Sequence, residues 1–250
     1  MEPLLLAALV LSAGIAAAVL GLLGFGFGLT MISLAPWFMP IDVAIPVTAG
    51  LSLPLTVVMA WRHRHEVKLR RVMPLLIGCV PGVAIGVLML KELDETVMKA
   101  ALGLFLVVYA AGSLGAPSTR RFTIGAGWGW GFGFLGGVFG GAFNCSGPPV
   151  VLYATLRDMQ KGALVGTLQG FFFVQGVFTT SGMALTGLLT LETLLLDLYC
   201  LPVVGAGIWL GDALHHRIDQ ESFKRVVLIA IGLTGVALLA PSLGLGPNGP

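Results

Sequence analysis

Hydrophobic residues occur along this sequence in long runs that short polar clusters separate. The longest runs without Asp, Glu, Lys or Arg are 3–41, 43–61, 72–90, 100–119, 122–156, 162–191 and 226–250. A helix needs roughly 20 apolar residues to cross the hydrocarbon core of a membrane, where it satisfies its own backbone hydrogen bonds. The alternating strands of a membrane barrel, each of about ten residues, are not seen in the sequence. The pattern therefore predicts an all-α polytopic membrane protein.

The composition agrees with this prediction. Hydrophobic residues make up 56% of the 250 residues and charged residues 10%, whereas an ordinary soluble domain has about 25% charged residues. The mean hydropathy is +0.95. No polar stretch is long enough to form a soluble catalytic domain. Cys79, Cys145 and Cys200 all lie inside apolar runs, and an odd number of cysteines in such places argues against a disulfide framework.

Two copies of one pattern follow each other along the chain. Near the start of each copy, at an offset of 119 (140 minus 21), the matches are Gly21, Gly28, Ala44 and Thr48 with Gly140, Gly147, Ala163 and Thr167. Near the end, at an offset of 125 (207 minus 82), they are Gly82, Gly86, Asp94 and Lys99 with Gly207, Gly211, Asp219 and Lys224. We predict two repeats, 1–116 and 117–250, with about five helical segments each. Internal repeats of this kind are common in transporters.

Basic residues predict which helix ends face the cytoplasm, because cytoplasmic loops are enriched in Lys and Arg. Segment 62–71 holds five of them, and we place it inside. Alternation from there also places 215–225 inside, and leaves only Lys91 and Lys99 of the 14 basic residues outside. The equivalent loops 62–71 and 186–192 then lie on opposite faces, so the repeats are predicted to be inverted in topology. Both termini are expected on the periplasmic or extracellular side of the inner (plasma) membrane.

Runs 3–41 and 122–156 are too long for one crossing each, because the first would extend about 58 Å as a helix. The predicted orientation requires each run to begin and end on the same face, either as two tilted helices or as a hairpin that stops partway. Glycine-rich segments 24–28 and 140–149 mark the turns. Irregular backbone at membrane depth is tolerated only where protein or a cavity covers it. These two breaks are therefore the best indications of a site.

A glycine stripe leads to the second break, with glycines at 125, 129, 133, 137 and 141. Residues spaced by four share one helix face, and a face of glycines lets two helices approach closely. We expect this stripe to pack the two hairpins against each other rather than to contact a substrate.

At each break a helix restarts, and its first N–H groups can bind an anion at the positive end of the helix dipole. The candidate contacts are Gly26, Gly28, Thr30, Thr48, Asn144, Cys145, Ser146, Thr167 and Gln169. A plainer interpretation is that the Ser and Asn side chains cap the interrupted helices, and that the others bond between helices. Both interpretations can hold, because a capping group can also contact a ligand.

Asp197 lies within the apolar stretch 193–214 and is a candidate for proton coupling, since ionisable residues inside a membrane are usually functional. The alternative is an ordinary position near Glu192 and the outer interface. Histidines and cysteines do not stand at metal-ligand spacing, and the glycine-rich segments lack the Lys-Ser/Thr of a phosphate loop. We expect no enzyme activity, cofactor, metal or nucleic-acid partner. The basic segment 62–71 is expected to contact lipid headgroups.

Three features occur in both halves: a glycine-rich break, an Ala-x-x-x-Thr motif and a small-residue helix. They stand at 24–28 and 140–147, at Ala44/Thr48 and Ala163/Thr167, and at 81–86 and 203–211. Together they resemble the sulfite exporter TauE/SafE family of anion permeases, from about residue 4 to residue 240. The resemblance implies transport of sulfite, of sulfonates such as sulfoacetate, and of related small sulfur-containing anions. Many members have a plainer glycine run where this sequence reads Asn144-Cys145-Ser146.

The predicted function is that of a secondary transporter that exports such an anion by alternating access. Export would be driven by proton coupling or by the membrane potential. A permease for another small anion is one alternative, and a non-transporting membrane assembly or scaffold protein is another. The expected partners are the small anion and membrane lipid, and the apolar helices are compatible with a homodimer.

Overall fold

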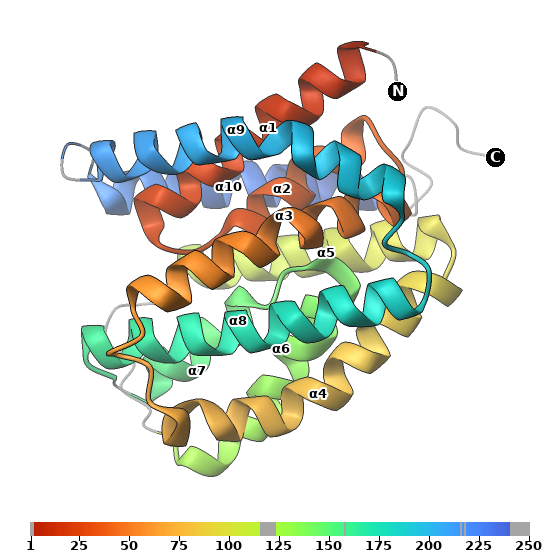
Figure 1. Ribbon diagram of the computed structural model, residues 1–250. Coiled ribbons are helices and arrows are strands. Elements are labelled where there is room, and N and C mark those ends of the chain that lie inside the picture. Colours follow the sequence, from red (N-terminus) through yellow and green to blue (C-terminus); the bar gives the residue numbers. More distant parts are fainter. Residues whose placement is uncertain (1–2, 116–123, 158, 216, 218, 241–250) are drawn as a thin grey trace. The chain divides into compact units, whose positions relative to one another are not determined.

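The computed structural model describes residues 3–115, 124–157, 159–215, 217 and 219–240. Every secondary-structure element in this part of the chain is a helix (Figure 1), which confirms the all-α class. The elements in chain order are α1 (Pro3–Leu23), α2 (Phe27–Leu34), η1 (Ala35–Trp37), α3 (Ile41–Arg62), α4 (Leu69–Glu92), α5 (Glu95–Gly115), η2 (Ala126–Trp128), α6 (Gly129–Phe143), α7 (Gly147–Leu156), α8 (Lys161–Leu185), α9 (Leu191–Leu214) and α10 (Gln220–Leu239).

Seven of the described helices are long and apolar enough to cross a membrane, namely α1, α3, α4, α5, α8, α9 and α10. Large apolar side chains are exposed on many of them, as Trp61, Leu185 and Trp209 illustrate. In water such a surface would be unfavourable, whereas lipid tails can cover it. The chain is therefore a multi-pass membrane protein.

Both predicted breaks interrupt a helix. Helix α1 ends at Leu23 and α2 begins at Phe27, while α6 ends at Phe143 and α7 begins at Gly147. Within each run the two helices pack against each other, α1 on α2 and α6 on α7. Each run thus forms two packed helices, whereas the membrane face on which each run begins and ends stays a prediction.

The order of helix lengths also recurs along the chain. Helices α1 to α5 comprise an interrupted pair followed by three long helices, and α6 to α10 follow the same order. This recurrence agrees with five helical segments per predicted repeat, whereas the inversion of the repeats stays a prediction. The predicted boundary at 116/117, the basic pair Arg120-Arg121 and both chain ends lie outside the described residues.

The chain divides into two compact units, and each unit combines segments of both predicted repeats. Unit 1 consists of residues 1–44, 92–118 and 198–250. Unit 2 consists of residues 45–91 and 119–197. Helices α3 and α9 are continuous from one unit into the other, since the division falls after residue 44 and after residue 197. Each unit is described by itself below.

In unit 1, helix α1 packs against the later part of α9, and we call this contact the first glycine seam. A Cβ at Gly21 would lie only 2.6 Å from the carbonyl oxygen of Ile208. Helices α5 and α10 also meet through glycines, because a Cβ at Gly103 would lie 2.7 Å from the carbonyl oxygen of Gly235. Such separations leave no room for a side chain, so the backbones themselves are in contact.

In unit 2, helix α6 packs against α4, and we call this contact the second glycine seam. A Cβ at Gly141 would lie 2.6 Å from the carbonyl oxygen of Val83, and a Cβ at Gly133 or Gly137 would collide with α4 as well. The predicted close packing of the glycine stripe is thus confirmed, but its expected partner was wrong. The stripe meets α4 because that helix carries its own glycines, such as Gly82, at the matching positions.

The two glycine seams are counterparts in the predicted repeat. Each joins the first helix of one repeat to the fourth helix of the other: α1 to α9, and α6 to α4. Gly86 of α4 and Gly211 of α9, which match at an offset of 125, lie in the second and the first seam respectively. A reciprocal exchange of this kind is what two repeats of one structure would produce, and it supports the repeat.

Candidate functional site

The second break, residues 144–146, is a short irregular segment of unit 2 between α6 and α7. Asn144 ends α6 in the left-handed conformation, with φ 50° and ψ 34°. Asparagine tolerates this conformation better than most residues. Pro148 and Pro149 lie in the first turn of α7, where proline is favourable, unlike in a helix interior. The local sequence therefore stops one helix and starts the next within three residues.

The Asn144 side chain joins the second break to helix α3. Its Nδ2 donates to the Ser52 hydroxyl oxygen at 2.7 Å and to the Thr48 carbonyl oxygen at 3.1 Å. The Ser52 hydroxyl in turn donates to the same Thr48 carbonyl at 2.7 Å. Both amide hydrogens of Asn144 are therefore used within the protein, and its Oδ1 is the side-chain atom left to accept a further bond.

The Ser146 side chain joins the same break to helix α8. Its hydroxyl donates to Oε1 of Gln175 at 2.9 Å, and Nε2 of Gln175 donates to the Thr179 hydroxyl oxygen at 2.6 Å. The Gln175 amide lies directly on α6, because a Cβ at Gly140 would be 2.6 Å from its Nε2. All three polar residues are at least 95% buried. A buried chain of satisfied hydrogen bonds of this kind is rigid.

The second break is thus held from two sides, by α3 through Asn144 and by α8 through Ser146. Cys145 lies between them and is 2% exposed. The plainer expectation, that these side chains cap the interrupted helices, is not what the described part of the chain shows for Ser146, whose hydroxyl makes no cap bond to α7. These side chains position helices from other parts of unit 2, so the break is a preorganised element.

The start of α7 is poor in backbone donors. Proline has no N–H group, so among Gly147, Pro148 and Pro149, the first three residues of α7, only Gly147 can donate. The start of α7 can therefore donate fewer backbone hydrogen bonds to an anion than we expected. What the second break offers instead is mainly two polar side chains, the half-buried Asn144 and the buried Ser146.

The first break, residues 24–26, belongs to unit 1 and is built differently. Gly24 and Gly26 have φ values of 76° and 100°, which glycine adopts without strain. Phe27, Gly28 and Leu29 begin α2, and the first N–H groups of a helix have no acceptor within it. No proline interrupts this start. The first break therefore offers a row of backbone donors.

Thr30 follows in the same turn of α2 and is 7% exposed. Its backbone N–H donates to the Gly26 carbonyl oxygen at 2.9 Å. Its hydroxyl oxygen, however, is buried without a hydrogen-bond partner among the described residues. Burying a hydroxyl without a partner is costly, and such an atom is often left for a ligand or a water molecule.

Two other predicted contacts lie on α8, before Gln175. The Thr167 hydroxyl donates to the Ala163 carbonyl oxygen of its own helix at 2.7 Å, with the Met159 sulfur 3.7 Å away. Gln169 is 5% exposed. Eight residues separate Thr167 from Gln175, which is about 12 Å along a helix. The structure thus brings together Thr48, Asn144, Cys145 and Ser146, whereas Thr167 bonds locally.

Asp197 is a second buried polar feature of unit 2. It lies on α9, is 7% exposed, and neither carboxylate oxygen has a hydrogen-bond partner among the residues that the structure describes. The carboxylate lies against Gly50 of α3, where an added Cβ would collide with Oδ2. Only glycine at position 50 leaves room for this acid. At the offset of 125, the counterpart of Asp197 is the apolar Val72.

Ser52, Gln175 and Thr179 also belong to the polar cluster, although the sequence did not predict them as contacts. A signal was present, because Ser52 follows Thr48 by four residues and Thr179 follows Gln175 by four. Residues at this spacing share a helix face. In the described part of the chain, no three His, Cys, Asp or Glu side chains come together as metal ligands would.

Interrupted helix pairs within a bundle of spanning helices define a class of multi-pass membrane protein, and secondary transporters are built in this way. The family model described as sulfite exporter TauE/SafE matches residues 9–238. The chain therefore belongs to the sulfite exporter TauE/SafE family, whose members are membrane transporters rather than enzymes.

A curated relative is the "Probable sulfite/organosulfonate exporter TauE" of Cupriavidus necator. It is 25% identical to this chain over 226 residues, which cover 88% of each protein. No solved structure matches the chain significantly.

Proposed function

We propose that this protein exports a small sulfur-containing anion, sulfite or an organosulfonate such as sulfoacetate, across the inner membrane. Family membership supports a membrane transporter, and the name of the Cupriavidus relative supports the substrate class. The single structural observation that carries the proposal is the polar second break, where the half-buried Asn144 and the buried Ser146 each bond to a different helix. A buried polar element inside an apolar bundle needs a functional reason, because it is costly to place there.

The candidate contacts divide into two groups with different chemistry, one in each unit. Gly26, Gly28 and Thr30 supply backbone donors and a hydroxyl without a partner among the described residues. The second group supplies side chains: the buried polar Thr48, Ser146, Thr167 and Gln169, the half-buried Asn144, and the buried thiol of Cys145. We propose that the first group binds the anion's oxygens most directly, because N–H and O–H groups donate to them.

Alternating access is the mechanism that we propose for the transport step. It would proceed by rocking of the two repeats, and the two interrupted helix pairs support it because secondary transporters contain such pairs. For an anion leaving an inside-negative cell, the membrane potential contributes about 2.3 kcal/mol per charge at 100 mV. We further propose the orientation in which 62–71 and 215–225 are cytoplasmic and both termini are periplasmic.

Asp197 is our proposed proton-coupling residue. A buried carboxylate without a partner has to bind a proton or another cation to stay buried. In proteoliposomes, a proton gradient should accelerate transport by the wild type. Asp197→Asn should lose most of this acceleration, whereas Glu192→Gln, an exposed acid five residues earlier in α9, should keep it. Equal acceleration in both variants would exclude Asp197 from coupling.

The transport proposal is tested with purified protein in proteoliposomes on a solid-supported membrane. Currents are recorded after concentration jumps of sulfite, sulfoacetate, taurine, sulfate and acetate. A saturable current for sulfite or sulfoacetate, reduced at least tenfold by Asn144→Asp, is the expected result. Saturation only by acetate would favour the alternative of a different anion.

The scaffold alternative predicts no current from folded protein for any member of the panel. The second glycine seam argues against a scaffold role, because Gly133, Gly137 and Gly141 pack α6 against α4 of the same chain. Those glycines are not available to pack a partner protein.

A further inference from the structure

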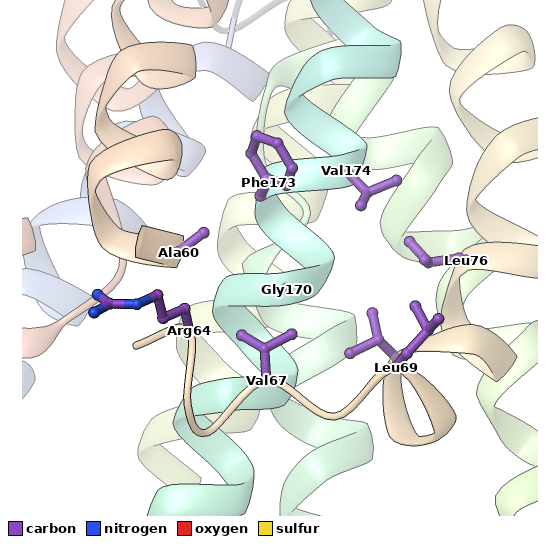
Figure 2. Close-up of a pocket in the computed structure, with 9 residues that line it drawn as sticks. Ala60, Arg64, Val67, Leu69, Leu76, Gly170, Phe173 and Val174 are labelled. Atoms are coloured by element: carbon purple, nitrogen blue, oxygen red, sulfur yellow. The ribbon is translucent and has the colours of Figure 1, made fainter. Parts of the chain in front are cut away.

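A small pocket in unit 2 lies outside the two breaks. Its volume is about 240 Å³, and helices α3, α4 and α8 surround it together with the connection between α3 and α4. Apart from Arg64, every lining residue is apolar, including Ala60, Val67, Phe173 and Val174. Figure 2 shows the apolar side chains around the pocket, with the guanidinium of Arg64 at its edge and pointing away from them.

Close packing holds the wall of the pocket in place. The connection between α3 and α4 lies on α8 where that helix has two glycines. A Cβ at Gly166 would collide with the carbonyl oxygen of Glu66, and a Cβ at Gly170 would lie 2.9 Å from Cγ1 of Val67. The N–H of Glu66 donates to the His63 carbonyl oxygen at 2.9 Å, which closes a turn in this connection. The pocket is thus a formed feature of the fold.

Arg64, the one charged residue that lines the pocket, belongs to a strongly basic segment. Segment 62–71 carries five Lys and Arg residues and one acid, Glu66, whose carboxylate lies 3.5 Å from Nδ1 of His63. Arg64 and Lys68 are exposed. Arg64 donates to the Trp61 carbonyl oxygen at 3.0 Å, and its guanidinium lies 4.9 Å from the centre of the Trp61 ring. A guanidinium has five N–H donors, so this placement leaves others to bind an anion.

An exposed tryptophan beside basic residues at the end of a spanning helix is typical of the membrane–water interface. Trp61 is 70% exposed and lies at the end of α3. The pocket therefore lies at the depth where lipid headgroups meet acyl chains. A molecule with a phosphate at one end and a hydrocarbon chain at the other matches both features. Its phosphate can contact the exposed cations while its chain enters the apolar cavity.

We propose that this pocket binds one anionic phospholipid. The end of an acyl chain enters the cavity between Ala60, Phe173 and Val174, and the phosphate is bound by Arg64 with Lys68 beside it. A small hydrophilic anion fits less well, because it would lose its hydration among apolar side chains for a single guanidinium. The proposal does not depend on what the protein transports.

The test measures lipid retention by native mass spectrometry of the purified full chain. Phosphatidylglycerol and phosphatidylcholine with identical acyl chains are titrated separately and in competition. The wild type should retain one phosphatidylglycerol at least tenfold more strongly than phosphatidylcholine. Arg64→Gln should reduce this preference to below threefold. Arg225→Gln removes the same charge from an exposed position on α10 and should keep the preference.

Two further variants test the acyl-chain part of the proposal. Val174→Phe and the milder Ala60→Leu both fill the cavity and should weaken retention of phosphatidylglycerol, while thermal unfolding reports whether each is folded. Glycerol phosphate, which has the headgroup without chains, should not displace the lipid. Equal retention of both lipids by the wild type, unchanged retention in both folded variants, or displacement by glycerol phosphate would each overturn the proposal.

Discussion

The two helix breaks of this protein lie beside counterpart glycine seams but carry different chemistry. The first break is made by Gly24 and Gly26 in left-handed conformations, and α2 then starts with free backbone donors. The second break is made by Asn144, whose side chain bonds to α3, and α7 then starts with two prolines. One break presents donors, whereas the other is bonded into its surroundings.

The two breaks occupy equivalent positions in the predicted repeat, and this difference indicates that they have different roles. Side chains whose donors are all bonded to neighbouring helices are less able to donate to an anion, but they hold the break in shape. Backbone N–H groups at a helix start can bind an anion without a buried cation. We therefore interpret the second break as a framework and the first as the more direct anion contact.

The largest effects are expected in the two glycine seams, which we interpret as equivalent. Gly137→Val in the second seam and Gly207→Val in the first should both abolish folded protein or lower its Tm strongly, since overpacking costs about 1–3 kcal/mol or more. In both helices a neighbouring glycine, Gly131 and Gly205 respectively, offers a control. An added Cβ there meets nothing within 4 Å among the described residues.

Thermal unfolding in detergent measures all four seam variants. Gly131→Val and Gly205→Val should unfold near the wild-type temperature. A strong effect in one seam and none in the other would show that the seams are not equivalent, and the repeat would lose its main structural support.

The next largest effect is expected at Asn144. Asn144→Asp keeps the shape of the side chain but removes both donated hydrogen bonds, to Thr48 and Ser52. The loss of two hydrogen bonds, with a carboxylate placed beside two oxygen atoms, should cost about 1–3 kcal/mol in total, so Tm should fall by several degrees and transport should be lost. Asn144→Gly, which keeps the left-handed backbone, is the control for the conformation alone. An Asp variant as stable as the wild type would contradict the framework role.

A smaller effect is expected at Gly26. Gly26→Ala places a Cβ on a residue with φ 100°, which costs about 1–2 kcal/mol. The nearest side-chain atom, Cγ1 of Val19, would be 3.6 Å away, so the effect is one of strain rather than of collision. A modest fall in Tm, with a higher KM for the transported anion, is the expected result in the proteoliposome assay. A wild-type Tm would show that the first break relaxes without cost.

Much of the fold could be predicted from the sequence, because charge-free runs set the spanning helices and glycine-rich segments set the breaks. The hydrogen-bond partners of the polar side chains could not be predicted from the sequence. The plainer interpretation of Ser146 was a cap of α7, but its hydroxyl bonds to Gln175 of α8. The glycine stripe was expected to meet the other hairpin, but it meets α4. Such pairings depend on how distant helices pack, which local sequence patterns do not specify.

The central claim, that the first break contacts the anion directly, is tested most directly at Thr30. Its buried hydroxyl oxygen has no partner among the described residues, so Thr30→Val should leave Tm within about one degree of the wild type. Binding of the best substrate from the current panel is then measured by titration calorimetry. Loss of one hydrogen bond to a charged ligand should raise Kd about tenfold or more. An unchanged Kd in a variant of unchanged stability would contradict the account.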